Sequence, residues 1–208
     1  MTTPTASTQP WRLILASQSP ARLDTLRRAG LDPEVQVSEV DESAWDLPDP
    51  AQLSARLAQL KAEAVYDRLA SPSPVVVVGC DSILSLDGQA CGKPGSPEAA
   101  AALWRRTSGR SAILVTGHHL IVADPEPRRA TRVAQTVVHF AGLDDAEIAA
   151  YVATGEPERV AGGFTIDGLG GPFISGLEGD PHNVVGLSLP LLRLMLADLG
   201  VAWTSLWP

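Results

Sequence analysis

The sequence predicts an α/β protein. Short apolar or β-branched runs alternate with helical patterns along the 208 residues, as they do in α/β folds. Four consecutive valines at 75–78 stand between prolines and a glycine, which is typical of a buried central strand. Neither an internal repeat nor a long linker interrupts the chain. Residues 11–208 are therefore expected to form one domain, and residues 1–10, rich in Thr, Ser and Pro, a disordered tail.

The first third of the chain is expected to contain two strands and two helices. Residues 12–16 are apolar and form the first strand. Ser19 and Pro20 then start a helix as its cap and its first helical residue, and Gly30 ends that helix. The second strand and a longer helix, with leucines along one face, are expected at 34–40 and 50–69.

The middle of the chain is expected to hold the central strand, a hairpin and a helix. A Ser-Pro-Ser-Pro break at 71–74 precedes the valine strand. An Asp-Gly pair at 87–88, after the apolar run 83–86, is a hairpin signal. A Ser-Pro-Glu start at 96–98 opens a helix that ends near Gly109.

The last hundred residues are expected to begin with two long strands joined by a Pro-rich turn. A helix, a glycine-crowded loop and a closing apolar helix follow. In order, these segments are 113–123, 124–127, 129–140, 144–153, 161–171 and 187–199. His118 and His119 are neighbours on the first long strand and should point to opposite faces, so they do not form a metal site together.

Composition and charge exclude several classes of function. The net charge of −8 argues against broad binding to nucleic acid, whose phosphates require a basic surface. No apolar run approaches the ~20 residues that span a bilayer. The first ten residues also lack the basic and apolar segments of a secretory signal. Two cysteines, Cys80 and Cys91, are too few for a disulfide framework and favour a reducing cytosol. We therefore expect a cytoplasmic protein without nucleic-acid or membrane partners.

Asp81 is the sharpest candidate for chemistry. It follows the valine strand, and α/β sheets place ligand sites at the carboxyl ends of such strands. Gly79, two residues earlier, allows the backbone to approach another group closely. An Asp that merely caps a turn is the alternative interpretation. Cys80 has no His nearby in the sequence, so it is expected to be a small apolar residue rather than a nucleophile.

Other polar residues suit an anionic ligand or a metal. Ser17, Ser19 and Arg22 surround a helix start, whose free N–H groups and partial positive charge attract phosphate. Lys93 lies in a stiff Gly-Lys-Pro-Gly loop that lacks the spacing of a Walker A motif. The adjacent acids at 41–42 offer oxygen ligands to a divalent cation. Each also has a plain interpretation, as a helix cap, a solvated lysine or solvated acids.

Taken in order, these motifs resemble the Maf family of nucleotide pyrophosphatases, from residue 13 to about residue 196. Each piece is loose, but the ordered set is specific, and its variants are most similar to actinobacterial members. The pieces are LASQSPAR at 15–22, VDE at 40–42, VGCDS at 78–82, GKP at 92–94, SG at 108–109 with TG at 116–117, Y-x-x-x-x-E at 151–156 with AG at 161–162, and NVVGL at 183–187.

The resemblance implies a fold and an activity. The fold would be a mixed, twisted central sheet with flanking helices, in two lobes around a long cleft, akin to inosine triphosphate pyrophosphatases. The activity would be that of a nucleotide diphosphatase, which hydrolyses nucleoside triphosphates, including modified ones, between the α and β phosphates. A divalent cation, Mg²⁺ or Mn²⁺, a cytoplasmic location and a homodimer are implied with it. A house-cleaning role and a role in cell-division arrest are also implied.

Site residues follow from the resemblance by position. Asp81 would be the catalytic proton acceptor, and Glu42 and Asp81 would hold the metal. The substrate-binding residues would be Ser17, Ser19, Arg22, Lys61, Lys93 and Asp167. Ala21 replaces a basic residue of many members, which removes one phosphate contact. Asp167 replaces the Gln of pyrimidine-preferring members and, because an ionised carboxylate only accepts hydrogen bonds, suits a base that presents donors, such as guanine or its methylated form.

Two alternatives share this cleft. A non-catalytic nucleotide-binding regulator of septum formation would bind the same ligand without turnover. A nucleotidyltransferase would use related chemistry at the α-phosphate, but it needs an acceptor site, and the sequence shows no motif for one. Release of pyrophosphate in the presence of Mg²⁺ or Mn²⁺ separates the hydrolase from the regulator.

Overall fold

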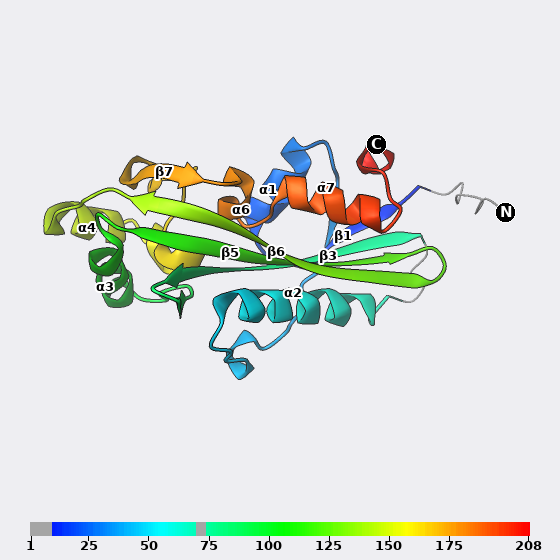
Figure 1. Ribbon diagram of the computed structural model, residues 1–208, viewed down its shortest axis with the longest axis horizontal. Coiled ribbons are helices and arrows are strands. Elements are labelled where there is room, and N and C mark those ends of the chain that lie inside the picture. The colour runs from blue at the N-terminus through cyan, green and yellow to red at the C-terminus, as the bar shows by residue number, and fades with distance from the viewer. Residues whose placement is uncertain (1–9, 70–73) are drawn as a thin grey trace.

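The computed structural model describes residues 10–69 and 74–208, and within them the expected α/β class is confirmed (Figure 1). The predicted tail, except Pro10, and residues 71–73 of the Ser-Pro break lie outside the described residues. The strands are β1 (Arg12–Leu15), β2 (Glu34–Val35), β3 (Val75–Leu86), β4 (Gln89–Cys91), β5 (Ser111–Ala123), β6 (Pro127–Phe140) and β7 (Ile174–Glu178). The α-helices are α1 (Pro20–Arg28), α2 (Pro50–Tyr66), α3 (Pro97–Thr107), α4 (Asp145–Val152), α5 (Glu156–Arg159), α6 (Pro181–Val185) and α7 (Leu189–Asp198).

All of these strands belong to one mixed sheet in the order β2-β1-β3-β5-β6-β7, with β4 paired to β3. β1 runs parallel to both β2 and β3, and the remaining pairs are antiparallel. β3, β5 and β6 have 12, 13 and 14 residues, so they extend along the whole molecule and connect its two ends.

Helices cover both faces of the sheet. Figure 1 shows α2 along one face and α1, α6 and α7 on the other, while α3 and α4 lie at the far end of the long strands. The buried apolar residues form one cluster beneath α1 and α7, a second beneath α2, and a third around Trp104 at the end that carries α3 and α4. No helix in the described ranges is long and apolar enough to cross a bilayer.

Local sequence signals determine several element boundaries as predicted. The Ser19 side chain accepts the N–H of Arg22 and caps α1, and Ser96 caps α3 in the same way. The hairpin between β3 and β4 turns at Asp87 and Gly88, whose φ values are 54° and 80°. Positive φ at both turn residues is what the predicted Asp-Gly turn requires.

The strand that carries Asp81 is longer than predicted. The sequence suggested separate strands at 75–78 and 83–86, but β3 continues through Gly79 and Asp81 without a break. The reason is its partner, because β5 pairs with β3 from Val75 to Ser85 and satisfies the backbone all along it. Asp81 therefore lies in the middle of a strand and not at its end.

Other segments also differ from the expectation. The strand predicted at 34–40 is reduced to the two residues of β2, because its partner β1 ends at Leu15. Beyond β2, the Gln36 N–H still donates a hydrogen bond to the carbonyl oxygen of Leu15. β7, α5 and α6 were not predicted at all. α5 and α6 have only 4 and 5 residues, too few for a helical period to show in the sequence.

Candidate active site

A cavity of about 750 Å³ opens at the point where β3 changes neighbours. β1 pairs with β3 only as far as Val78, and β4 begins to pair at Leu84. Between them, one edge of β3 has no strand partner among the described residues, and Asp81 and Ser82 line the cavity there. The carboxyl end of a parallel strand and a change of strand neighbour are where α/β sheets form ligand sites. That rule applies here to β1 rather than to β3.

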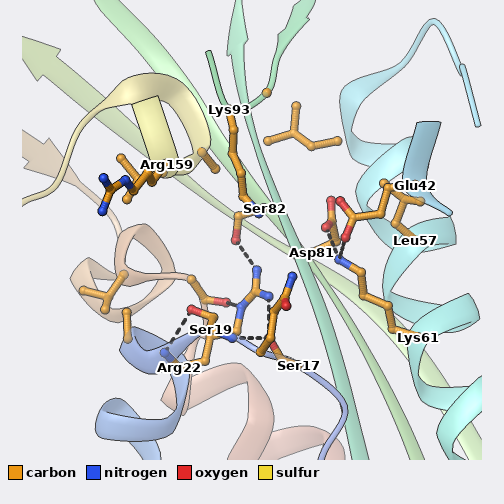
Figure 2. A pocket seen from close by; sticks show the side chains of 18 of the residues that line it. Ser17, Ser19, Arg22, Glu42, Leu57, Lys61, Asp81, Ser82, Lys93 and Arg159 are labelled. Atoms are coloured by element: carbon orange, nitrogen blue, oxygen red, sulfur yellow. Dashed lines mark hydrogen bonds and ion pairs between the residues drawn. The ribbon is translucent and has the colours of Figure 1, made fainter. Parts of the chain in front are cut away.

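All eight residues predicted for the site line this one cavity, although they are spread along the chain from Ser17 to Asp167. Figure 2 labels all of them except Asp167. They come from four parts of the chain: the β1–α1 turn with the start of α1, the segment before α2, α2 with β3, and the loop after β4. The eight are Ser17, Ser19, Arg22, Glu42, Lys61, Asp81, Lys93 and Asp167.

Arg22 is held rigidly at one side of the cavity. Its Nε donates to the carbonyl oxygen of Gly186 at 2.8 Å, and its Nη atoms donate to Ser17 Oγ and Ser82 Oγ, both at 3.1 Å. Gly186 has φ 118°, a conformation that favours glycine, and a Cβ there would lie 3.2 Å from Arg22 Nε. The guanidinium is therefore preorganised for an anion at the start of α1.

A buried polar network supports Arg22 from behind. Ser82 Oγ and Thr116 Oγ1 are 3.0 Å apart, and Thr116 Oγ1 donates to the carbonyl oxygen of Asn183 at 3.1 Å. The Asn183 amide donates to Leu114 O and Thr136 Oγ1, which ties α6 to the sheet. Ser82, Thr116 and Asn183 belong to the motifs noted in the sequence, but no role was predicted for them, because their function depends on contacts 34 to 69 positions apart.

Lys61 lies between two carboxylates at the centre of the site. Its Nζ is 2.6 Å from Asp81 Oδ1 and 2.8 Å from Glu42 Oε1. Burial raises the pKa of Asp81 above its usual value, and the charges of Lys61 and Arg22 oppose that rise. Burial also opposes ionisation of Glu42, but the hydrogen bond and charge of Lys61 outweigh it and lower the pKa of Glu42.

Lys61 reaches Asp81 because α2 lies directly on the backbone of the sheet. A Cβ on Gly79 would collide with the carbonyl oxygen of Ala58, and one on Gly117 would collide with that of Ser54. Both glycines therefore admit the helix backbone where any side chain would separate it from β3 and β5. The close approach predicted for Gly79 is thus to α2, one turn before Lys61.

Lys93 and Arg159 line the cavity without a hydrogen bond or ion pair to any residue in the described ranges. Figure 2 shows Lys93 extending from its loop toward Ser82, on the side opposite Lys61. Arg159, at the end of α5, was not predicted as a site residue. The only signal that could have identified it is its position between the two parts of the motif at 151–156 and 161–162, because the four-residue α5 has no recognisable helical pattern. Both cations are available to a ligand.

Glu156 organises the glycine-rich segment that carries Asp167. Its carboxylate accepts the hydroxyls of Tyr151 and Thr165, each at 2.7 Å, and the backbone N–H groups of Leu169 and Gly170. The predicted loop contains only two short 3₁₀ turns, at Ala161–Gly163 and Gly171–Phe173. One carboxylate therefore replaces the regular hydrogen bonds that this segment lacks.

We expect Glu156→Gln to destabilise the protein at neutral pH. Glutamine cannot accept four donors, and a lost hydrogen bond to a charged group costs about 1.5–3 kcal/mol. Burial opposes the ionisation of Glu156, but the bonds from Thr165 and Tyr151 outweigh it and lower its pKa. The stabilisation is therefore present above the ordinary Glu pKa and is lost as the pH falls through the lowered one.

Urea unfolding as a function of pH measures this effect. The difference in unfolding free energy between wild type and Glu156→Gln should be largest near pH 7 and should shrink below about pH 4, near the ordinary Glu pKa. Glu158→Gln is the matched control, because no side-chain hydrogen bond of Glu158 occurs among the described residues. A pH-independent difference would show that the carboxylate charge is not what holds the loop.

The histidines and Cys80 take no part in the cavity. His118 donates from Nδ1 to Thr116 O and accepts the Ser188 N–H at Nε2, and burial lowers its pKa to about 4. His119 faces Glu63 of α2, so the two histidines point to opposite faces as predicted. Cys80 is fully buried, which raises its pKa to about 11 and leaves it a neutral thiol, not a nucleophile.

The donor set at Lys61 suits a hard divalent cation that is shared with a ligand. No group of three or more His, Cys, Asp or Glu side chains among the described residues could hold a metal alone. Glu42 and Asp81 nevertheless direct one oxygen each at the same ammonium. Mg²⁺ is commonly held by one or two carboxylates together with substrate phosphates, so these residues fit a cation of that kind.

The model of the Maf-like protein family matches residues 12–199. Two similar proteins are each named nucleoside triphosphate pyrophosphatase. One from Cutibacterium acnes is 53% identical over 199 residues, covering 93% of each chain. One from Streptomyces coelicolor is 54% identical over 198 residues, covering 94% of each chain.

The fold is also similar to solved structures of low sequence identity. A nucleoside-triphosphatase, or dITP/XTP pyrophosphatase, from Mycobacterium abscessus is 16% identical, covers 90% of this chain and 94% of its own, and gives a TM-score of 0.43. The Ham1 protein of Staphylococcus aureus is 18% identical, covers 62% of this chain and 72% of its own, and gives a TM-score of 0.41.

Proposed function

The chain belongs to the family of Maf-like proteins, and we propose on that premise that it hydrolyses nucleoside triphosphates to the monophosphate and pyrophosphate. One observation carries this proposal for the site. Three cations, Arg22, Lys61 and Lys93, and two carboxylates, Glu42 and Asp81, face the same cavity. Because phosphoryl chemistry depends on positioning and charge neutralisation more than on covalent help, this set suits a triphosphate.

In this proposal the phosphates occupy the side of the cavity between Arg22 and Lys93. Arg22 is preorganised by Ser17, Ser82 and Gly186, so little ordering is needed when an anion binds. Lys93 has no hydrogen-bonding or ion-pairing partner among the described residues to give up. Ser19 lines the same side, although its hydroxyl already caps α1.

Asp81 acts on the water that attacks the α-phosphorus. Its carboxylate is directed into the cavity and is desolvated, so it accepts a proton more readily than an exposed Asp would. A divalent cation, Mg²⁺ or Mn²⁺, held by Glu42 and Asp81 would polarise the phosphate oxygens. The bond from the α-phosphorus to the bridging oxygen breaks, and pyrophosphate leaves with its charge offset by the cavity's cations.

Product analysis tests the proposed function. The purified chain should release nucleoside monophosphate and pyrophosphate in equal amounts from a triphosphate, with Mg²⁺ or Mn²⁺ present. Binding without turnover would support the regulatory alternative instead. Transfer of the nucleotide to an acceptor would support the transferase. Formation of nucleoside diphosphate and orthophosphate would show attack at the γ-phosphorus and contradict the proposal.

The base preference is proposed to depend on Asp167, which lines the cavity at the glycine-rich loop. An ionised carboxylate accepts hydrogen bonds but donates none, so it suits the donor edge of guanine or methylated guanine. Comparison of kcat/KM for dTTP, UTP, CTP and 7-methyl-GTP tests this proposal. A clear preference for dTTP would argue against it.

Lys93→Ala should weaken triphosphate binding and leave monophosphate binding almost unchanged. The Lys93 side chain lines the cavity, extends toward Ser82 (Figure 2) and is proposed to contact the β or γ phosphate. Loss of one charge-assisted contact of about 1.5–3 kcal/mol corresponds to roughly a 10- to 150-fold weaker affinity. Calorimetric titration with a non-hydrolysable triphosphate and with the monophosphate measures the two dissociation constants. Equal losses for the two ligands would place Lys93 elsewhere.

The cellular setting is proposed from the family membership. Both cysteines are free thiols, which suits a reducing cytoplasm. A homodimer is proposed as well, and sedimentation equilibrium tests it, because a monomer at micromolar concentration would exclude a stable dimer.

A further inference from the structure

Lys61 is paired through its ammonium with the same two carboxylates that are proposed to hold the metal. Its ammonium is 2.6 Å from Asp81 and 2.8 Å from Glu42, and its side chain is only 8% exposed. Two of its three donors therefore point at carboxylates rather than at a phosphate. These are also the two oxygens that a divalent cation would share. Lys61 and the metal therefore require the same carboxylate oxygens.

We propose that Lys61 occupies the cation position between Glu42 and Asp81 in the substrate-free protein and yields it when a metal arrives with the triphosphate. The inference rests on the proposed function. It concerns which cation the two carboxylates hold, and when. Lys61 is then both a stand-in for the metal and, once displaced, a ligand of the phosphates.

The length and flexibility of the lysine side chain allow this exchange. Its charge lies at the end of a flexible four-carbon stem, so the ammonium can move while the backbone of α2 stays fixed against Gly79. With Lys61 in place, two carboxylates and one ammonium leave a single net negative charge for an incoming cation. A triphosphate adds oxygen ligands for the metal and offers a new anionic partner for the ammonium.

Glu42 is the member of the pair that can adjust. Its side chain is 46% exposed, whereas that of Asp81 is 10% exposed and fixed on β3. Figure 2 shows the carboxyl groups of Glu42 and Asp81 both contacting the Lys61 ammonium. Asp81 thus keeps its place while the cation between the carboxylates changes.

Mn²⁺ binding to the substrate-free protein tests the inference without any turnover. Electron paramagnetic resonance of free Mn²⁺ gives the dissociation constant for wild type and for Lys61→Met. Removal of the competing ammonium should tighten Mn²⁺ binding by roughly 5- to 150-fold, the usual range for coupled sites. The gain should disappear in the double variant that adds Asp81→Asn, because one of the two carboxylates is then lost.

Lys93→Met is the matched control. It removes the same charge from the same cavity, but Lys93 makes no ion pair with Glu42 or Asp81. Mn²⁺ affinity should change far less in this variant than in Lys61→Met. An equal gain in both would show a general charge effect and overturn the inference. Circular dichroism checks the fold, and Lys61→Gln is a second variant in case Lys61→Met does not fold.

Coupling between metal and triphosphate gives an independent readout. In wild type, an α,β-methylene triphosphate should strengthen Mn²⁺ binding, and in Lys61→Met this strengthening should be smaller, because no ammonium remains to be displaced. Unchanged Mn²⁺ affinity in Lys61→Met and Lys61→Gln would overturn the inference, even if wild type still releases pyrophosphate. The reverse outcome, with tighter Mn²⁺ binding but no pyrophosphate from wild type, would overturn the proposed function alone.

Discussion

Asp81→Asn should abolish pyrophosphate release while leaving the protein folded. An amide has the shape of the carboxylate but cannot take a proton from the attacking water, and loss of general-base help typically costs about 10²–10⁴-fold in rate. The fold should survive because Lys61 keeps Glu42 as a partner at 2.8 Å. The variant therefore does not leave a buried charge unpaired, which is the situation that destabilises proteins most.

The measurement is kcat from continuous pyrophosphate release, with circular dichroism melting and nucleotide binding as checks. Asp145→Asn is the matched control, because Asp145 is exposed, pairs with Arg105 and lies outside the cavity. It should retain wild-type turnover. Wild-type-like kcat for Asp81→Asn would remove Asp81 from the reaction. Loss of both folding and activity would show that the Glu42–Lys61 contact cannot hold the site without Asp81, and would contradict the expectation that the fold survives.

Gly79→Ala should destabilise the protein strongly, because Gly79 lies directly against the backbone of α2. The new Cβ would collide with the carbonyl oxygen of Ala58 and would lie 2.9 Å from Ala62 Cβ, both on α2. Overpacking a tight contact costs about 1–3 kcal/mol, and more when the neighbour is backbone that cannot rotate away. Displacement of α2 would also pull Lys61 from Asp81, so activity should fall along with stability.

Urea denaturation measures the stability change, and Gly142→Ala is the control. A Cβ on Gly142 would meet nothing within 4 Å, so that variant should stay within about 0.5 kcal/mol of wild type. If Gly79→Ala proved as stable as Gly142→Ala, the close approach of α2 would not be what positions Lys61.

Local chemistry made part of the fold predictable from the sequence. Ser19 and Ser96 cap helices, and Asp87 with Gly88 forms a tight hairpin, because each signal acts within four residues. The position of Asp81 within its strand was not predictable in this way. It depends on β5, whose Gly117 is the strand partner of Asp81 and which extends the ladder through the polar stretch.

Local sequence signals indicated Asp81 and the turn from Ser17 to Arg22 as candidates, but only the family resemblance combined all the predicted residues into one site. Spacing alone left Lys93 as a solvated lysine and gave Lys61 no distinction within its helix. The cavity joins them because β1 ends beside the middle of β3 and because two glycines admit α2, and neither fact is local. Ser82 and Glu156 belong to noted motifs, but their roles were not predicted because each acts through contacts with distant segments. Arg159 was missed because it lies at the end of a four-residue helix.

We propose that a triphosphate binds and is cut in the cavity beside β3. A crystal structure of Asp81→Asn with Mn²⁺ and an uncleaved nucleoside triphosphate tests this most directly. The phosphates should lie among Arg22, Lys61 and Lys93, with the α-phosphorus the nearest of the three phosphorus atoms to residue 81. A triphosphate bound outside this cavity, or one whose base occupies the cationic side, would contradict it.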